Sequence, residues 1–232
     1  MKLLAIDTSS LACSVALLCE DGIAERHAEQ EREHTRLLVP MIREVLEETG
    51  MATTDLDAVV LGNGPGSFIG MRIAASVAQG IAHGAGLKIV PVSSMAAVAA
   101  QVFATSDHLE VVVAQDAHMG EVYLGVWRRG ENDLPLVSLP ERLHTQTPIG
   151  ELDESCANSR IAAGCGWQRY PDLLAANENL IGNRSPIRYP RARYLLPLAA
   201  DALARELAID PADLVPAYLR STVARPPAGS TP

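Results

Sequence analysis

Two aspartates that each follow a short apolar segment are the first candidates for chemistry in this chain. Three hydroxyl residues come directly after Asp7, and a carboxylate beside hydroxyl groups could hold a nucleotide phosphate and its hydrated Mg²⁺. His118 and Met119 follow Asp116 and are too bulky for a loop that closes around a phosphate, so we expect that ATP catalysis is not retained. An Asp at a strand end also has ordinary turn and capping roles. The candidate vestigial nucleotide cleft consists of Asp7, Thr8, Ser9 and Asp116.

A glycine-rich stretch, residues 62–70, joins an apolar segment to a helical pattern and could cradle a phosphate at a helix N-terminus. It contains neither Gly-x-x-x-x-Gly-Lys nor a correctly placed Gly-x-Gly-x-x-Gly, and no lysine lies within it. Glycines also form tight turns that pack a helix closely against a sheet. We favour this turn interpretation over phosphate binding.

Metal and hydrolase chemistry find little support in the sequence. No two of the six histidines stand four residues apart on an expected helix, and the His-Glu-x-x-His motif does not occur. The nucleophile motif Gly-x-Ser-x-Gly is missing as well. We therefore expect no metal site and no catalytic residue in this chain.

The two aspartates lie in hairpin patterns that open the two halves of the chain. Each pattern is an apolar strand, an Asp, a small-residue turn and a second strand, and a glycine turn ends it at Gly22 or Gly130. The Asp-to-Gly spacing is nearly the same in both copies. The repeat predicts an α/β fold of two related lobes, with duplicated mixed sheets facing each other across a cleft. Two unrelated hairpins within one α/β domain remain the alternative.

Helices and buried strands must position these residues. Helical periodicity marks residues 33–49, where Gly50 is the stop signal, and residues 68–83, which are rich in small residues. Glycines inside a helix destabilise it unless a close contact compensates. We expect further strands at residues 56–61, 89–92 and 161–167, and further helices at residues 95–103 and 192–207.

A change of composition near residues 105–108 marks the expected boundary between the lobes. Residues 1–106 form the N-terminal lobe in this division. Residues 107–223 form the C-terminal lobe, whose last segment can pack back on the first lobe. Residues 224–232 are rich in Pro, Gly and Ser and are expected to form a flexible tail.

The net charge of −9 disfavours unaided binding to nucleic acid, because attraction to a phosphate backbone is mainly electrostatic. One local basic cluster, interleaved with tyrosines, departs from this balance and is a candidate RNA contact. A solvated loop with local ion pairs explains the same pattern, and we favour it. The cluster consists of Arg184, Arg188, Arg191 and Arg193.

No stretch approaches the roughly 20 consecutive apolar residues that a membrane span needs. The N-terminus enters a strand almost at once, without the pattern of a signal peptide. The four cysteines show no Cys-x-x-Cys spacing and are expected to be reduced. These features together predict a cytoplasmic protein.

Five sequence blocks, in order along nearly the whole chain, resemble those of the TsaB (YeaZ) family. The resemblance implies a two-lobe actin-like fold related to sugar kinases, actin and chaperone ATPases. It also implies a role in making threonylcarbamoyladenosine at the adenosine beside the anticodon of tRNAs that read codons starting with A. The blocks are LAIDTS at residues 4–9, HTRLLVP at 34–40, GPGSFIGMRI at 64–73, GEVY at 120–123 and PAYLR at 216–220.

The resemblance implies a non-catalytic subunit that binds the catalytic paralogue TsaD, alongside the ATPase TsaE, with a functional link to the TsaC/Sua5 enzyme that makes the threonylcarbamoyl-AMP donor. ATP and metal are then expected on the partner subunits, with no cofactor in this chain and tRNA reached only through the complex. TsaD-type chains carry a His-x-x-x-His metal motif where this chain has Ser94 and Val98. Two departures from the TsaB pattern are Ile69 in place of Thr and His118 in place of Arg.

The resemblance also implies that the helices at residues 33–49 and 68–83 form a bundle with the equivalent helices of a related subunit. The same surface would form a homodimer when the partner is absent. Both helices could instead only cover the sheet. The predicted partner-binding residues are Leu37, Met41 and Val45 as apolar anchors, and Gly70, Ala74 and Ala78 as points of close approach.

Three other functions remain open. The chain could be a stand-alone actin-like ATPase or kinase that uses Asp7 and Asp116. It could be a metallopeptidase, a label that the wider family has carried, although the missing ligand pairs argue against this. It could also bind tRNA directly through the basic loop at residues 184–193.

Overall fold

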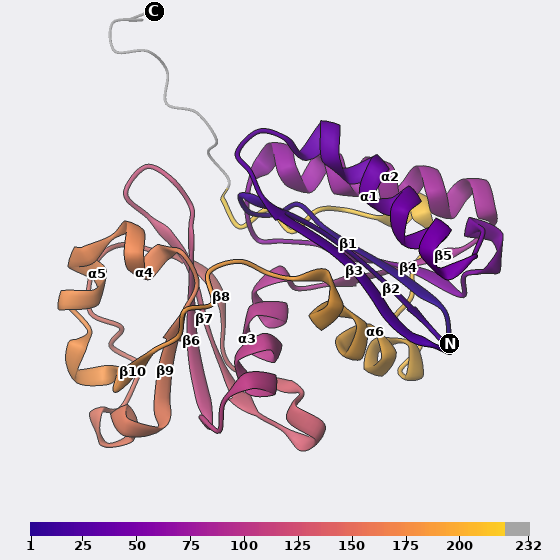
Figure 1. The fold of residues 1–232 in the computed structure, drawn as a ribbon. Coiled ribbons are helices and arrows are strands. Elements are labelled where there is room, and N and C mark those ends of the chain that lie inside the picture. The colour runs from indigo at the N-terminus through magenta and orange to yellow at the C-terminus, as the bar shows by residue number, and fades with distance from the viewer. Residues whose placement is uncertain (221–232) are drawn as a thin grey trace, which may run out of the picture.

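Two five-stranded sheets form the framework of the protein, one in each lobe (Figure 1). The structure is a computed structural model that describes residues 1–220, so the expected tail at residues 224–232 lies outside the described residues. In the first sheet, the antiparallel strands β1 (Leu3–Asp7), β2 (Ala12–Cys19) and β3 (Gly22–Glu29) continue into the parallel strands β4 (Ala58–Gly62) and β5 (Lys88–Val92). The strand order is β3-β2-β1-β4-β5.

The second sheet repeats this plan. An antiparallel set, β6 (Glu110–Asp116), β7 (Val122–Arg129) and β8 (Pro135–His144), is followed by the parallel strands β9 (Arg160–Ala163) and β10 (Asn183–Arg184). The order β8-β7-β6-β9-β10 matches that of the first sheet strand for strand. The predicted duplication of a mixed α/β lobe is therefore confirmed, and Asp7 and Asp116 end equivalent strands.

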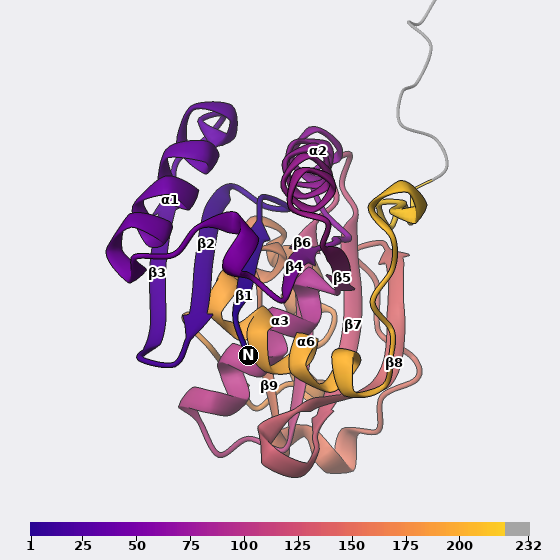
Figure 2. The same cartoon turned by 90° about the vertical axis from the view of Figure 1, so that its right-hand side faces the viewer.

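Helices cover both faces of each sheet, and two of them change lobes (Figure 1). Figure 2 shows the helices of the first lobe on the two sides of its sheet. Helices α1 (His34–Thr49) and α2 (Phe68–Ala85) cover one face of the first sheet, and α6 (Leu195–Ala204) covers the other. Helix α3 (Ser94–Thr105) follows a strand of the first sheet but packs on the second. Helix α6 follows the second lobe in sequence but packs on the first. This exchange joins the lobes through their cores.

Shorter helices complete the second lobe and the connections. Helices α4 (Gly166–Arg169) and α5 (Pro171–Ala175) cover the face of the second sheet opposite to α3. No helix within residues 1–220 is long and apolar enough to cross a membrane. Short 3₁₀ helices occupy Thr53–Asp55, Glu131–Asp133, Glu154–Ser159, Glu178–Leu180, Ala192–Tyr194 and Pro211–Asp213.

Two of the expected elements need correction. The strand expected to run to Trp167 ends at Ala163, because Gly164 has a left-handed φ of 100° and turns the chain. A Cβ at that glycine would lie 2.2 Å from the carbonyl oxygen of Ala114, so only glycine fits. The helix expected at residues 192–207 is divided into a 3₁₀ turn and α6, and Glu206 has a left-handed φ of 58° beyond its end.

The last described segment, residues 214–220, connects the two lobes. Two first-lobe side chains hold its first part. The side-chain amide of Asn63 donates to the carbonyl of Val215 at 3.0 Å, and Arg72 donates to the Tyr218 hydroxyl at 3.0 Å. Arg220 then reaches the second hairpin turn, where it pairs with Glu121 at 2.5 Å. The same guanidinium donates to the carbonyl of Ala117 at 3.0 Å.

We expect Arg220→Ala to lower the free energy of unfolding by about 2 kcal/mol, because it removes an ion pair and leaves the carbonyl of Ala117 without a donor. Urea denaturation of the purified protein measures this. Arg205→Ala is the matched control, since its pair with Asp201 is exposed and contributes little. Equal losses in the two variants would mean that Arg220 does not hold the lobes together.

Candidate functional site

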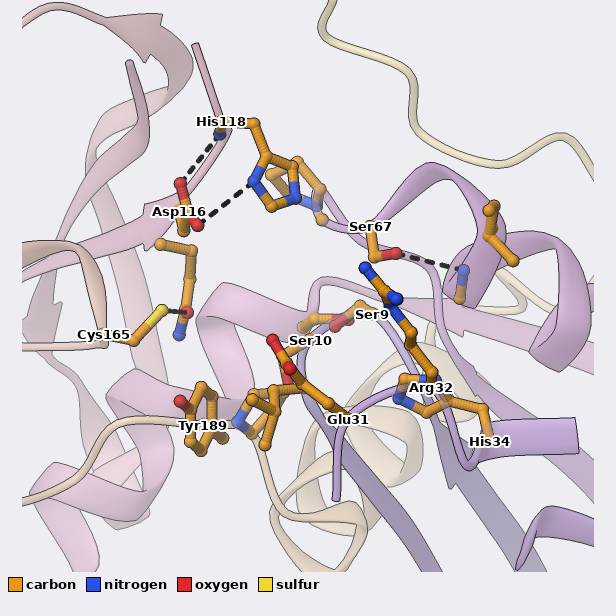
Figure 3. A pocket seen from close by; sticks show the side chains of 18 of the residues that line it. Ser9, Ser10, Glu31, Arg32, His34, Ser67, Asp116, His118, Cys165 and Tyr189 are labelled. Carbon is orange, nitrogen blue, oxygen red and sulfur yellow. Dashed lines mark hydrogen bonds and ion pairs between the residues drawn. The ribbon is translucent and has the colours of Figure 1, made fainter. Parts of the chain in front are cut away.

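A cleft of about 810 Å³ lies between the two lobes, within the usual size range of small-molecule sites (Figure 3). The ends of β1 and β6, the start of α2 and the loop before α1 contribute to its walls. From the first lobe it is lined by Ser9, Ser10, Glu31, Arg32, His34 and Ser67, among others, and from the second by Asp116, His118, Cys165, Arg169 and Tyr189, among others.

Asp7, the first predicted cleft residue, is 1% exposed and lies beneath the cleft surface. Its Oδ1 accepts hydrogen bonds of 2.8 Å from the backbone N–H and from the hydroxyl of Ser9, and its Oδ2 has no partner among the described residues. Burial raises the pKa of the Asp7 carboxyl to about 6. A Cβ at Gly62 would lie 1.9 Å from Oδ2, so this backbone covers the carboxyl group closely. The group is a poor candidate for holding a hydrated cation.

The glycine-rich stretch packs directly on the first hairpin turn. Thr8 is fully buried, and its hydroxyl donates to the carbonyl of Gly70 at 2.7 Å. The backbone N–H of Ser67 donates to the carbonyl of Ser9 at 2.6 Å. A Cβ at Gly66 would lie 2.0 Å from that same Ser9 oxygen. These contacts support the interpretation of the stretch as a turn that packs α2 against the sheet.

Asp116 lines the cleft, but its carboxylate is already engaged. It accepts hydrogen bonds from the Tyr170 hydroxyl at 2.7 Å and from the backbone N–H of His118 at 2.8 Å. Arg169 pairs with it at 3.1 Å. The structure thus brings Ser9 and Asp116 to one cleft, whereas Asp7 lies below it. A nucleotide in this cleft stays a prediction.

The second-lobe partners of Asp116 were not found from the sequence. Arg169 and Tyr170 follow β9 closely, and β9 pairs in parallel with β6, which ends at Asp116. The carboxyl ends of parallel strands meet at one edge of a sheet, and ligand sites form there. Residues just beyond the turn after β9 could therefore have been proposed as neighbours of Asp116.

The first-lobe rim of the cleft contains an arginine and a histidine that sequence reasoning also missed as site residues. Arg32 is exposed, has a left-handed φ of 60°, and has no ion-pair partner among residues 1–220. His34, the first residue of α1, is only 9% exposed, and its Nε2 has no hydrogen-bond partner among those residues. The sequence places a histidine at a helix start, but only the fold shows that it borders a cleft.

Ser94 and Val98, which stand where TsaD-type chains have histidines, lie on α3. Ser94 is 2% exposed, and its hydroxyl accepts the N–H of Gly64 at 3.1 Å. Val98 is fully buried in the core of the second lobe. Among the described residues, no group of three or more His, Cys, Asp and Glu side chains is placed to hold a metal ion.

Three arginines of the basic loop form ion pairs with β3 of the other lobe. Arg188 pairs with Glu29 at 2.9 Å, and Arg191 pairs with Glu25 at 2.5 Å. Arg193 lies 3.7 Å from the same Glu25 carboxylate. Arg184 is exposed in β10. The pairs support the ion-paired interpretation of the loop, and an RNA contact stays a prediction.

The predicted partner-binding residues belong mostly to the core of the single chain. Val45, Ala74 and Ala78 are fully buried, Met41 is 9% exposed, and Leu37 is half-buried. Gly70 is buried too, since a Cβ there would lie 1.9 Å from the carbonyl oxygen of Thr8. The buried members cannot be surface anchors, and their identification needs correction. The periodicity marked the faces of α1 and α2 that cover the sheet.

A different face of α2 is open. Ile69 is 71% exposed, and Val39 on α1 is 41% exposed. A Cβ at Gly80 or Gly84 would meet no atom within 4 Å. An apolar groove runs along this exposed face, and we call it the outer groove of α2. It is lined by Phe68, Ile69, Arg72, Ile73, Ser76 and Val77.

Comparisons with known proteins give a consistent result. A family model described as TsaD, tRNA N6-adenosine threonylcarbamoyltransferase, matches residues 22–226. The tRNA threonylcarbamoyladenosine biosynthesis protein TsaB of Escherichia coli K12 is 36% identical, over 97% of this chain and 96% of the relative. The TsaB protein of Haemophilus influenzae is 35% identical, over 96% of this chain and 95% of the relative.

The solved structure of YeaZ from Pseudomonas aeruginosa has a TM-score of 0.83 at 31% identity, covering 94% of this chain and 99% of that one. Another solved structure from the same organism, described as an uncharacterized protein with similarity to peptidase YEAZ, has a TM-score of 0.84 at 32% identity, with the same coverage.

Proposed function

This chain belongs to the TsaB family of tRNA threonylcarbamoyladenosine biosynthesis proteins, and on that premise we propose that it serves the pathway as a non-catalytic scaffold. It binds a TsaD-type paralogue, which transfers the threonylcarbamoyl group to the adenosine beside the anticodon of tRNAs that read codons starting with A. The TsaE-type ATPase joins this pair, and a TsaC/Sua5-type enzyme supplies the donor. ATP, metal and tRNA are contacted by the partners. All of this takes place in the cytoplasm.

The state of the two aspartates supports a role without catalysis. Asp7 is buried under Gly62, and Asp116 is engaged by Arg169 and Tyr170. A phosphoryl-transfer site needs carboxylates that are free to hold Mg²⁺ beside the phosphates. The serine and valine on α3 likewise lack the nitrogen atoms that TsaD-type histidines would offer to a metal.

We place the partner-binding surface at the outer groove of α2. Exposed apolar side chains that lie together on a helix mark interaction surfaces. Gly80 and Gly84 leave open space in which a second helix can approach closely. A TsaD-type partner shares the fold of this chain, since the TsaD model matches it, and can therefore offer the equivalent pair of helices. A second copy of this chain offers the same helices when the partner is absent.

We expect light scattering to give twice the chain mass for the protein alone, and a one-to-one complex after the TsaD paralogue of the same organism is added. Ile69→Glu places a charge in the groove, and Gly80→Arg fills the open space beside it. Both variants should abolish homodimer and heterodimer, because a desolvated unpaired charge is strongly unfavourable in an interface core. Neither position lies in the monomer core, so the fold should persist.

Leu136→Glu is the matched control, because Leu136 is 53% exposed on β8 of the other lobe. This variant should assemble like the unmodified chain. A chain that is monomeric alone and forms no complex with the paralogue would overturn the scaffold proposal. Tight Mg-ATP binding by the chain alone, lost in Asp7→Ala, would favour the stand-alone ATPase instead.

A further inference from the structure

We propose that Arg72 on α2 forms an ion pair with Glu47 on α1 of a second copy of this chain, and that this pair sets the orientation in which two copies meet. The inference rests on the partner-binding surface proposed above and adds a charged contact to it. Arg72 lines the outer groove of α2 among mostly apolar side chains. Helix α2 contains no Asp or Glu, and Arg72 is its only Arg or Lys.

The guanidinium of Arg72 is held in position within its own chain. Its Cζ lies 3.8 Å from the centroid of the Phe68 ring and 5.9 Å from that of Tyr218. Its Nε donates to the Tyr218 hydroxyl at 3.0 Å. The two terminal nitrogens have no hydrogen-bond or ion-pair partner within residues 1–220. A guanidinium that is fixed by aromatic rings offers these remaining donors in a planar fork, which matches the two oxygens of a carboxylate.

A helix that docks in the outer groove would cover this cation. Removing a guanidinium from water is strongly unfavourable unless the partner supplies an anion that also accepts its hydrogen bonds. A partner with only apolar residues at this point would therefore bind poorly. The groove fits a helix that presents a carboxylate opposite Arg72.

A second copy of this chain can offer such a carboxylate from α1 and its N-cap, residues 33–49. Three of the four glutamates in this region pair with arginines of their own chain, and these are Glu33, Glu44 and Glu48. Glu47 is exposed and has no ion-pair partner within residues 1–220. It is therefore the carboxylate of this region that is available to another molecule.

The direction of the helices brings Glu47 and Arg72 together. The first residues of α1 and α2 both border the interlobe cleft, so the two helices run away from the cleft in the same direction, on one face of the first sheet (Figure 1). Arg72 lies near the start of α2, and Glu47 lies in the last turn of α1. A two-fold axis perpendicular to the helices makes those of the second copy antiparallel and places the end of its α1 beside the start of α2. The symmetry then forms the pair twice.

Charge reversal with light scattering over a dilution series tests the pair. Arg72→Glu and Glu47→Arg should each weaken the homodimer at least about thirtyfold, as expected when one member of a desolvated charge pair is lost. Both positions are exposed in the single chain, so the fold should persist, and circular dichroism checks this. An equimolar mixture of the two variants should form a dimer. The introduced glutamate of one chain then faces the introduced arginine of the other, and the second contact keeps the original pair.

Two further variants are the controls. Arg128→Glu makes the same charge change at an exposed position on β7 of the other lobe and should dimerise like the unmodified chain. Tyr218→Phe keeps the aromatic ring and removes only the acceptor of the Arg72 Nε hydrogen bond, so it should dimerise as well. Loss of the dimer in Tyr218→Phe would mean that Arg72 acts by holding the last described segment, and this would overturn the pair.

The outcomes separate this inference from the partner-binding surface on which it rests. An unmodified chain that is monomeric, or a dimer that persists in Ile69→Glu, would contradict the surface itself. A dimer that is lost in Ile69→Glu but persists in Arg72→Glu would leave the surface in place and overturn the ion pair. Two monomeric charge-reversal variants whose mixture stays monomeric would also overturn it.

Discussion

Gly70→Ala is expected to lower the free energy of unfolding by about 3 kcal/mol or more, because its Cβ would lie 1.9 Å from the carbonyl oxygen of Thr8. The atom that it would meet belongs to the backbone and cannot rotate away. The Thr8 hydroxyl also donates to the Gly70 carbonyl, so a shift of α2 breaks this hydrogen bond as well. The fold should loosen where the first hairpin turn meets the helix.

Gly80→Ala is the matched control on the same helix. A Cβ there meets nothing within 4 Å, and alanine is favoured over glycine inside a helix by about 1 kcal/mol. This variant should therefore be slightly more stable than the unmodified chain. Urea denaturation followed by circular dichroism measures both changes. Similar stability of Gly70→Ala and the unmodified protein would show that α2 can move away from the first hairpin turn at little cost, and that the close contact with Thr8 does not fix the glycine-rich stretch.

Asp7→Asn is expected to raise the free energy of unfolding above pH 7 by about 3 kcal/mol, the value that corresponds to the shift of the Asp7 pKa from 3.8 to about 6. The folded pKa lies above the unfolded one, so the folded state binds the proton more tightly. The stability that protonation adds is complete below pH 3.8 and is lost as the pH rises through 6. Asparagine keeps the Oδ1 acceptor for Ser9 and cannot ionise.

The measurement is the free energy of unfolding from pH 4 to pH 8 for the unmodified chain, Asp7→Asn and Asp107→Asn. Asp107 is exposed, and its replacement should leave the profile unchanged. Glu141 also has a raised pKa, about 7, because it is buried, so a weaker pH dependence of the same sign should remain in Asp7→Asn. A loss of stability in Asp7→Asn above pH 7 would mean that the ionised carboxylate has a stabilising partner, as an ATPase-type site would require.

Much of the fold could be predicted because its signals are local. The helix expected at residues 33–49 is α1, and Gly50 follows it with a left-handed φ of 65°, since periodicity and a glycine stop signal act over one helix. The helix expected to end at His83 continues to Ala85, where Gly86 provides the stop. The duplicated hairpins were visible for the same reason, because a strand, an Asp and a turn occupy a few adjacent residues.

The functional faces could not be predicted in this way. The apolar stripe that includes Val45 and Ala78 has the same spacing whether it covers a sheet or a partner, and burial against strands distant in sequence distinguishes these cases. Ile69 attracted notice only as a departure from a family pattern, but in the fold it is the most exposed large apolar side chain of α2. Exposure depends on which elements pack together, and one sequence does not state this.

The sequence by itself determined the repeated α/β lobes, the positions of α1 and α2 and the resemblance to one family, because these depend on short-range spacing and on residue order. Only the tertiary structure decided that Asp7 is buried, that Asp116 forms an ion pair with Arg169, and that Arg191 pairs with Glu25 in the other lobe. The physical reason is that burial and charge pairing are set by contacts between residues far apart in the chain. The state of each ionisable group therefore follows from the packing of the lobes.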